Sequence, residues 1–426
     1  MQLQASRLDR ECRKALRRGP LSWVLPFGAR GVPVMAEARV HLDHNATSPL
    51  RPEARDALIA ALEEGGNASS VHTGGRAARG RLETARKQVA GLVGAQMRGV
   101  MFTSGATEAN ALALHPAWEI AGRPVTCDVL LTSAVEHPAV LRGHRFADEN
   151  VEVLPVDATG RLDLDALSAR IAVHAGAGRK AMVSLMLANN ETGVIQPVAE
   201  AAALVHAQGG IMHCDAVQGA GRLPIHMGTL GLDLLSLSAH KLGGPQGAGA
   251  LVAAHEDTRP LVPLLRGGGQ ERSRRGGTEN VPGAAGFGAA AKAAQDVLDK
   301  EALRLAHLRD RLETEIVAAL PETEVVGSGA ARVANTSCLA FGGLKAETLV
   351  IALDLSHIAV SAGSACSSGK VGPSHVLSAM GLDDARAGGA IRLSLGWSST
   401  EQDVDRTIAA LRRVVPQVRS RSLRAA

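Results

Sequence analysis

The 426-residue chain contains 46% hydrophobic and 21% charged residues, proportions typical of a soluble globular protein that is long enough for two domains. Its formal charge of +4 is concentrated at the start, because residues 1–34 carry seven Arg and Lys against two acids and leave about −1 for the rest. The main body therefore lacks the charge for a nucleic-acid surface, and no apolar run approaches the roughly 18 residues of a membrane helix.

Five cysteines are scattered along the chain, and their odd number argues against a disulfide framework. We therefore expect a reducing compartment and a cytoplasmic location. No pair of cysteines has the spacing of a zinc finger, so we predict no metal site.

Residues 1–34 differ in composition from everything that follows. A basic stretch precedes the apolar run LSWVLPF at 21–27. Two acids and the lack of a small-residue cleavage site argue against a targeting segment. We expect a disordered extension, or an upstream start codon chosen over Met35.

From Val40 onward, short apolar runs alternate with helical patterns, beginning with a brief strand and a helix that Pro52 opens. This alternation predicts an α/β fold with a mostly parallel seven-stranded sheet flanked by helices. Ligands bind beyond the carboxyl ends of the strands in such sheets. The expected strands are 100–103, 129–132, 151–156, 182–187, 211–215, 232–237 and 249–253.

We expect a smaller α+β domain after the large one. An Ala-rich helical stretch at 283–297 links the two domains. The large domain would comprise residues 51–298, and the small domain residues 35–50 and 299–426. The elements expected after the linking helix are helices at 301–320, 347–354 and from Glu401, with strands at 336–341 and 391–395.

Lys241 and Asp215 each stand at the end of a predicted buried strand. Burial lowers the pKa of an amine, and the neutral amine is a nucleophile. Taken alone, Lys241 is more simply a surface lysine that enters a loop. Together with Asp215 it suggests pyridoxal phosphate, for which a lysine forms the Schiff base and an acid keeps the pyridine nitrogen protonated. Cys214 should face the other side of its strand and pack in the core.

Polar clusters follow three further strands at the same rim. The SGATE run at 104–108 can bring helix-start N–H groups and a hydroxyl to an anion, although an ordinary helix cap explains it equally well. His137 can stack on a ring or move protons, although a lone histidine is more often a capping group. The amides of Asn189 and Asn190 can bind a cofactor oxygen or a carboxylate, although two consecutive asparagines are also common in ordinary turns. The coincidence of these clusters favours a binding site.

Two glycine-rich stretches are less specific. Residues 266–278 combine glycines with arginines, which suits an anionic ligand, although a solvated basic loop is equally consistent. Residues 244–249 can be compared with a dinucleotide-binding fingerprint, but no helix clearly follows, so we reject a nicotinamide site.

Cys366 and Arg392 are singular residues later in the chain. Cys366 lies among small residues in SAGSACSSGK at 361–370, which suits a mobile nucleophile rather than a core position. Its thiol would need help from a nearby cation or base, because the usual pKa of about 8.5 leaves little thiolate at neutral pH. Arg392 lies in a strand-like run and needs an anionic partner, for which a bidentate carboxylate is natural.

Nine motifs occur in one order between about Val40 and about Val415: LDHNATSP, FTSGATEAN, EHPAV, NNETGV, HCDAVQ, SAHKLGGPQG, GGTEN, SAGSACSSG and IRLSLG. In order and spacing they resemble those of the NifS/IscS-type cysteine desulfurases, class V members of the fold type I pyridoxal-phosphate-dependent enzymes. The resemblance implies removal of sulfur from L-cysteine, which leaves L-alanine and a persulfide on Cys366. It also implies delivery of that sulfur to iron–sulfur cluster assembly or to other acceptors.

The resemblance also implies a role for each matching residue. Lys241 would carry the Schiff base, His137 would stack on the cofactor ring and move protons, and Thr278 would come from the other subunit of a homodimer. The other implied cofactor contacts are Asp215 with the pyridine nitrogen, Gln218 with the phenolic oxygen, Thr107, Ser238 and His240 with the phosphate, and Ala106 and Asn190. Asn45, Asn190 and Arg392 would bind the substrate.

Two alternatives stay open. One is a related class V enzyme that acts on selenocysteine, although Cys366 argues against a lyase that needs no thiol. The other is a sulfur-carrier or regulatory subunit without turnover, although all the expected reactive residues are present. The sequence does not identify the sulfur acceptor or iron–sulfur scaffold protein that would make contact at Cys366.

Overall fold

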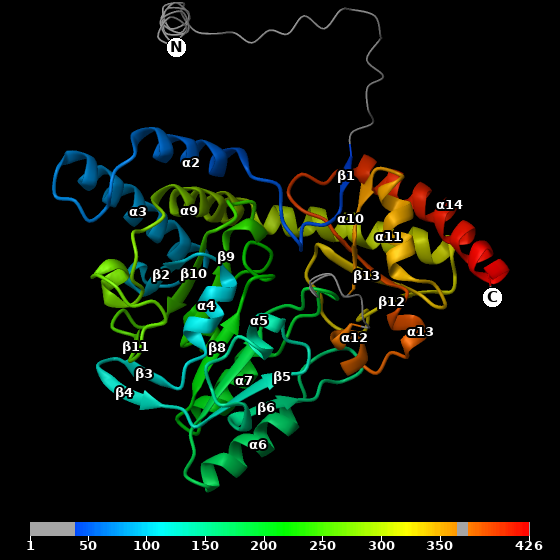
Figure 1. Ribbon diagram of the computed structural model, residues 1–426. Helices are drawn as coiled ribbons and strands as arrows, with labels where there is room; N and C mark the ends of the chain where they lie inside the picture. Colours follow the sequence, from blue (N-terminus) through cyan, green and yellow to red (C-terminus); the bar gives the residue numbers. More distant parts are fainter. Residues whose placement is uncertain (1–38, 364–373, 426) are drawn as a thin grey trace, which may run out of the picture. The chain divides into compact units, whose positions relative to one another are not determined.

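The computed structural model describes the backbone of residues 39–363 and 374–425, with side chains up to residue 421 (Figure 1). The predictions for residues 1–34 and for Cys366 lie outside the described residues. The strands are β1 Val40–His41, β2 Val100–Thr103, β3 Ala117–Ile120, β4 Arg123–Thr126, β5 Val129–Ser133, β6 Val151–Leu154, β7 Ala181–Met186, β8 Ile211–Asp215, β9 Leu234–Ser238, β10 Gly249–Ala253, β11 Arg259–Pro260, β12 Thr323–Val325, β13 Thr336–Phe341, β14 Ile358–Ala359, β15 Ser361–Ala362 and β16 Ala390–Ser394. The α-helices are α2 Pro52–Glu64, α3 Thr73–Leu92, α4 Ala106–Ala113, α5 Pro138–Leu141, α6 Leu164–Gly176, α7 Val198–His206, α8 Met227–Leu230, α9 Val281–Asp296, α10 Leu298–Ala319, α11 Ala346–Asp354, α12 His375–Ala379, α13 Asp384–Ala387 and α14 Glu401–Ala425.

A seven-stranded sheet has the order β2-β10-β9-β8-β7-β5-β6. β10 runs antiparallel to both of its neighbours, and the other pairs are parallel. The predicted α/β fold with a mostly parallel seven-stranded sheet is therefore confirmed. Because parallel strands end at one edge, the last residues of β7, β8 and β9 come together there.

Successive residues of the sheet face two different cores. Val129 and Leu131 of β5 pack with residues of α3, α6, α7 and α9, whereas Leu130 between them packs with α4 and α5. Burial on both faces explains why these strands appear in the sequence as continuous apolar runs. Cys214 belongs to the first core, on the side of β8 away from Asp215, as its alternation predicted.

A second, antiparallel sheet has the order β12-β13-β16-β15. Residues of α10, α11 and α14 pack with it around a separate core, beside the parallel pair of β1 and β14 (Figure 1). The predicted division into domains 51–298 and 35–50 with 299–426 stays a prediction.

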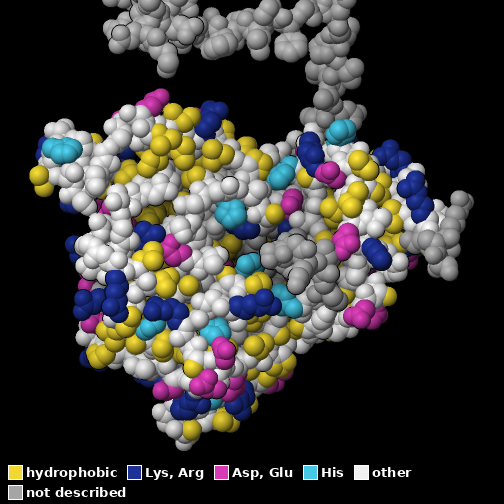
Figure 2. Space-filling model, viewed as in Figure 1, with side chains coloured by type: hydrophobic (Ala, Val, Ile, Leu, Met, Phe, Trp, Pro, Cys, Tyr) yellow, Lys and Arg dark blue, Asp and Glu magenta, His cyan; other side chains and the backbone are white. Residues whose placement is uncertain are grey.

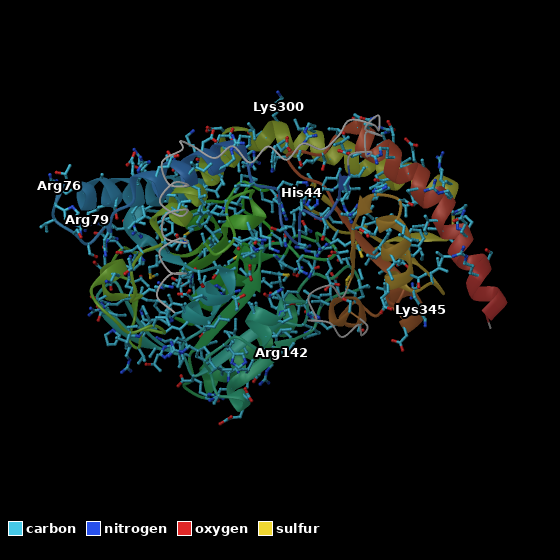
Figure 3. All side chains as sticks on the ribbon, turned by 45° about the horizontal axis from the view of Figure 1, so that its top comes forward. His44, Arg76, Arg79, Arg142, Lys300 and Lys345 are labelled. Atoms are coloured by element: carbon cyan, nitrogen blue, oxygen red, sulfur yellow. The ribbon has the colours of Figure 1, made fainter. Side chains whose placement is uncertain are left out.

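Residues 42–48, which we call the crossing segment, run from the second sheet to the edge of the first. His44 N–H donates to Ser394 O of β16 at 3.1 Å, and Ser48 N–H donates to His240 O at 2.9 Å. His44 within the segment is fully buried, and Figure 3 shows it between the elements of the two sheets. The crossing segment therefore brings main-chain atoms from the start of the chain to Lys241.

The sequence did not predict a small sheet with the order β11-β3-β4. Pro124 lies inside β4, and proline argues against a strand in any pattern-based interpretation. In the β3–β4 turn, Ala121 has φ 50° and Gly122 has φ 74°. Alanine seldom adopts a positive φ, so its presence does not predict a hairpin turn. Along the described residues, no helix is both long and apolar enough to cross a membrane.

Candidate active site

A cavity of about 500 Å³ lies at the carboxyl ends of the central strands. Asp215 and Ser238 are the last residues of β8 and β9, and Asn190 follows β7. The cavity is lined by Asn45, Ala46, Ser104, Gly105, Ala106, Thr107, Asn110, His137, Ala139, Met186, Ala188, Asn190, Asp215, Val217, Gln218, Ser238, His240, Lys241, Gln246, Gly247, Ala248 and Arg392. The fold thus gathers residues from the whole length of the chain around one space.

Among the described residues, Thr278 is the predicted site residue that does not line this cavity. Thr278 is exposed and lines a neighbouring cavity of about 180 Å³, which shares Ser104, Gly247 and Ala248 with the first. Cys366 lies outside the described residues. Within the described part of the chain, no group of three or more His, Cys, Asp and Glu side chains is arranged to hold a metal ion.

Asp215 is fixed in the cavity by two donors. Asn110 Nδ2 donates to its Oδ2 at 2.8 Å, and Val217 N–H donates to its Oδ1 at 3.0 Å. Asn110 Oδ1 is buried and has no hydrogen-bond partner among the described residues. Each carboxylate oxygen has two lone pairs, so Asp215 can still accept a bond from a protonated ring nitrogen.

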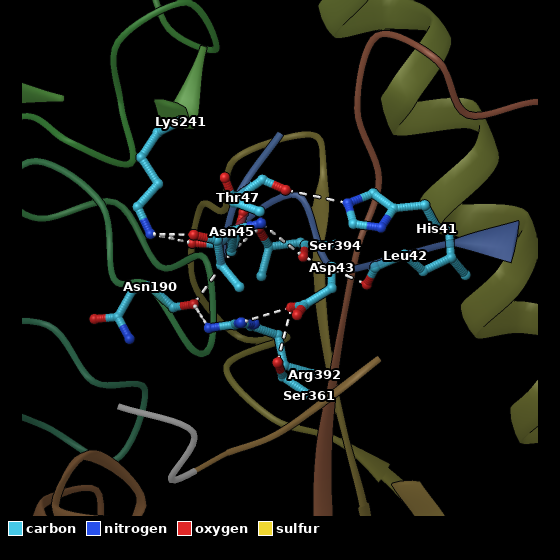
Figure 4. A network of polar contacts seen from close by, with 12 residues as sticks. His41, Leu42, Asp43, Asn45, Thr47, Asn190, Lys241, Ser361, Arg392 and Ser394 are labelled. Atoms are coloured by element: carbon cyan, nitrogen blue, oxygen red, sulfur yellow. Dashed lines mark hydrogen bonds and ion pairs between the residues drawn. The ribbon is translucent and has the colours of Figure 1, made fainter. Parts of the chain in front are cut away.

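Lys241 lies three residues beyond β9, on the short 3₁₀ turn Ala239–Lys241. Its Nζ donates to two carbonyls of the crossing segment, at 2.6 Å to Asn45 O and at 2.9 Å to Ala46 O (Figure 4). The half-buried amine is therefore held at the cavity wall by backbone oxygens.

His137 forms the N-cap of the short helix α5. Its Nδ1 accepts a hydrogen bond from Ala139 N–H at 3.1 Å, which leaves the proton of the neutral ring on Nε2. Burial lowers the pKa of His137, Lys241 and His375 lower it further, and Asp215 raises it. A neutral imidazole at the cavity can accept a proton.

The turn 104–107 and the end of β9 form one end of the cavity. The first N–H groups of α4 have no partner within the helix, so they can bind an anion. A Cβ on Gly249 would lie 2.6 Å from the backbone of this turn, so glycine allows the turn to pack against β10. His240 also lines the cavity, its Nδ1 lies 3.1 Å from Thr47 Oγ1, and its pKa is lowered to about 4, by burial and then by the charge of Lys241. The N–H groups of the turn and the imidazole of His240 therefore supply polar groups to the cavity wall.

Arg392 lies within β16 with only 2% of its surface exposed. Its Nη2 pairs with Asp43 Oδ1 at 2.8 Å, and its Nη1 donates to Asn190 O at 3.0 Å (Figure 4). Arg392 Nε and Asn190 Oδ1 are buried without a hydrogen-bond partner among the described residues. Because unpaired buried groups are costly, these two atoms indicate a place for a polar ligand group.

Asn45 and Gln218 meet at the Asn45 carbonyl, which accepts from Gln218 Nε2 at 3.0 Å. The Asn45 side chain is bonded within the protein, because its Nδ2 donates to Asn190 O at 3.1 Å and to Thr336 Oγ1 at 2.9 Å. Its Oδ1 accepts from Asn335 Nδ2 at 3.1 Å. Substrate binding by the Asn45 side chain stays a prediction.

Two residues of this site, Asn110 and Asp43, were not predicted from the sequence. Asn110 lies three positions after Thr107, a spacing that places both on one helical face, so its position carried a signal. Asp43 carried none, because its partner Arg392 is 349 residues away in the sequence.

Comparisons with known proteins agree with this geometry. Residues 40–407 match the family model described as aminotransferase class-V. The chain is 45% identical over 390 residues to a cysteine desulfurase of Cereibacter sphaeroides, with 90% of this chain and 97% of the relative covered. It is 41% identical over 392 residues to an IscS-like cysteine desulfurase of Mycobacterium tuberculosis, with 91% and 98% covered.

Solved structures extend the likeness to three dimensions. The X-ray structure of a NifS-like protein from Rickettsia africae ESF-5 is similar with a TM-score of 0.79 and 33% identity, over 89% of this chain and 99% of that chain. A structure of SspA in complex with cysteine is similar with a TM-score of 0.66 and 27% identity, over 83% and 98% of the two chains. The chain therefore belongs to the class-V aminotransferase family, within its group of cysteine desulfurases.

Proposed function

We propose that this chain uses pyridoxal 5′-phosphate to convert L-cysteine into L-alanine and a persulfide on Cys366. In the balanced reaction, the Cβ–S bond of cysteine breaks, an S–S bond forms at Cys366, and one proton moves to Cβ. No outside oxidant or reductant is needed. The observation that carries the proposal is the amine of Lys241 and the carboxylate of Asp215 in one cavity of a chain from this family.

The ring end of the cavity fits the cofactor. Lys241 would bond its aldehyde carbon, Asp215 would face its ring nitrogen, and Gln218 would lie near its phenolic oxygen. His137 would stack on the ring. When bound, pyridoxal phosphate supplies an electron sink for the Cα of an amino acid. Asp215 strengthens that sink because its negative charge favours a protonated ring nitrogen.

The other end of the cavity fits a phosphate group. The N–H groups around Ala106 and the hydroxyls of Thr107 and Ser238 supply donors, and His240 adds an imidazole. The small side chains of the 104–107 turn let a phosphate approach the backbone. We propose that Thr278 of a second copy completes this end, since Thr278 lines the adjoining cavity in its own chain.

His137 and Arg392 would act on the substrate. The lowered pKa of His137 suits an imidazole that takes up and returns a proton at the substrate thiol. Arg392, with its unpaired Nε, would bind the α-carboxylate, and Asn190 beside it would contact both substrate and cofactor. The amine of Lys241, once displaced by the substrate, would move the proton at Cα.

The three cysteines that the structure describes are poor candidates for the sulfur acceptor, which supports the choice of Cys366. Cys127, Cys214 and Cys338 are buried free thiols. Burial raises the pKa of Cys127 and of Cys338 to about 12 and raises the pKa of Cys214 well above its ordinary value. Buried thiols of this kind stay protonated at neutral pH and are poor nucleophiles.

We further propose that the chain works as a homodimer and passes its sulfur to a protein acceptor, such as an iron–sulfur scaffold. Apolar side chains gather over α2 on the face that Figure 2 shows. Ile59 and Leu62 of α2 are 42% and 61% exposed. If a second copy of the chain packed against α2, this apolar surface would be buried away from water.

The test is to purify the protein with its cofactor, reduce it with borohydride and map the label by mass spectrometry. We expect the cofactor on Lys241 Nζ and alanine formation from cysteine in the unreduced sample. The matched control is Lys292→Ala, a half-exposed lysine paired with Asp296, which should leave both results unchanged. A label on another lysine, or no alanine from cysteine, would overturn the proposal. Faster turnover of selenocysteine than of cysteine would favour the selenocysteine-acting alternative.

A further inference from the structure

Asp43 connects the crossing segment to the arginine of the cavity. Its Oδ1 accepts from Arg392 Nη2 at 2.8 Å and from Ser361 Oγ at 2.8 Å. Figure 4 shows the Asp43 side chain pointing at the Arg392 guanidinium, on the side away from Lys241. Asp43 does not line the cavity, so it reaches the site only through Arg392.

The backbone of Asp43 is fixed by the elements around it. Asp43 forms a parallel bridge with Ser394 of β16, two residues after Arg392. Its carbonyl accepts from Ala46 N–H at 3.0 Å and Thr47 N–H at 3.2 Å, closing a turn in the crossing segment. The carboxylate is therefore presented from a rigid base.

The Arg392 side chain is long and flexible, so its hydrogen-bond partners fix the orientation of its guanidinium. Asn190 O takes one end of the guanidinium at 3.0 Å, and Asn45 Nδ2 holds the same carbonyl at 3.1 Å. Asp43 takes the other end. With both Nη atoms bonded, the orientation of the unpaired Nε is determined as well.

We propose that Asp43 is a positioning residue, which holds Arg392 in the orientation that receives the carboxylate of an amino acid substrate. This inference rests on the proposed role of Arg392. A guanidinium that is already oriented loses less conformational freedom when the carboxylate binds, so Asp43 contributes to affinity without touching the substrate.

The test compares Asp43→Ala with Asp43→Asn in the cofactor-loaded protein, with cysteine as substrate. Alanine removes the acceptor for Arg392 Nη2, whereas asparagine keeps an oxygen at the same place. We expect Asp43→Ala to raise KM about tenfold, the size expected for a lost hydrogen bond to a charged group, with kcat within about threefold. Asp43→Asn should stay within about threefold of the native KM. The cofactor Kd should not change in either variant.

Ser361→Ala is the matched control, because it removes the other donor to the same oxygen and leaves the ion pair intact. It should leave KM within about twofold. If Asp43→Ala does not fold, Asp43→Ser, which is too short to reach Nη2, replaces it with the same expected rise in KM.

Native KM in the shortened Asp43 variant would overturn the inference, and so would equal damage from Asp43→Asn. A weaker cofactor Kd with unchanged KM would show a purely structural role and would also overturn it. Arg392→Gln separates the two proposals. If that variant leaves KM unchanged, the proposed role of Arg392 fails. If it raises KM and Asp43→Ala does not, only the positioning role fails.

Discussion

At the scale of single residues, Asp215 is the site residue whose charge, rather than its shape, is expected to matter most. Asp215→Asn keeps the shape and the donor from Val217, but removes the charge that would keep a ring nitrogen protonated. We predict at least a hundredfold loss of alanine formation, roughly 3 kcal/mol of barrier, with the thermal midpoint nearly unchanged. The measurement is alanine production with excess cofactor. Turnover within tenfold of native would show that another group does this work.

Glu191 gives a pH prediction. Burial raises its pKa to about 7 from an ordinary 4.5, although the Ser374 hydroxyl at 2.5 Å and the charge of Arg392 act in the opposite direction. Because the folded pKa lies above the unfolded one, the stabilising contribution is complete below about pH 4.5 and is lost as the pH rises through 7. The change amounts to about 3 kcal/mol in the free energy of unfolding.

Urea unfolding of Glu191→Gln and native protein between pH 4.5 and 8 measures this change. Glutamine keeps an oxygen for Ser374 but does not titrate. The native protein should lose stability relative to the variant across the window. Parallel curves would contradict the raised pKa of Glu191.

The residue types at the strand ends could be predicted because a polar side chain after a buried apolar run is conspicuous. Lys241, Asp215 and His137 could be predicted for that reason, and all three line the cavity. The contacts between them could not be predicted in the same way. The backbone carbonyls that hold Lys241 belong to residues about 195 positions earlier, and no side-chain pattern reports the direction of a carbonyl.

At the scale of elements, the loop at 266–278 shows how a basic stretch can be part of the core. Arg274 is buried and Arg275 pairs with Glu108 at 2.8 Å, so a simple solvated loop does not describe it. Glu271 receives both ends of Arg86 at 2.7 and 2.9 Å, and their side chains are 2% and 5% exposed. Anion binding by this loop stays a prediction.

We predict that Glu271→Gln lowers the free energy of unfolding by about 3 kcal/mol, because it removes the buried counterion of Arg86 and leaves only the partly exposed Glu83, at 3.1 Å, to pair with it. Glu119→Gln is the control, since its partner Arg259 is 56% exposed and such pairs contribute less than about 1 kcal/mol. Chemical denaturation measures both. Equal effects from the two substitutions would mean that the Arg86 pair does not anchor the loop.

Strands buried on both faces were predicted closely, because continuous apolar runs leave little freedom of interpretation. β2, β8, β10 and β13 have the predicted bounds. β6 ends at Leu154, two residues early, because Pro155 has no N–H for the ladder. The hairpin of β3 and β4 was missed because half-buried strands with proline carry no such signal.

At the scale of the whole molecule, a homodimer with Thr278 acting across the interface makes a prediction for mixed dimers. A dimer of one Lys241→Ala chain and one Thr278→Ala chain has one fully native site if Thr278 acts on its partner. It has none if Thr278 acts in its own chain. We predict that one site per mixed dimer binds pyridoxal phosphate with native affinity, measured by cofactor titration. The control is the dimer of two Thr278→Ala chains, and affinity no better than in this control would contradict the arrangement.

The site depends on two sheets joined by the crossing segment. The sequence predicts each sheet through its own apolar pattern, but it contains no periodic signal for their mutual placement. Arg392 beside Asn190 and Asn45 beside Asn190 are products of that placement. This explains why residues that line the cavity could be predicted from the sequence, whereas the hydrogen-bond network behind them could not.

Mass spectrometry of the intact holoprotein after a single turnover with L-cysteine shows whether Cys366 receives the sulfur of the substrate. We expect one added sulfur atom, located on Cys366, and one alanine released per active site. Cys366→Ser should give neither, although cysteine should still change the absorption of the bound cofactor. Sulfur on Cys12, Cys127, Cys214 or Cys338 instead of Cys366, or alanine formed at the native rate by Cys366→Ser, would show that Cys366 is not the sulfur acceptor.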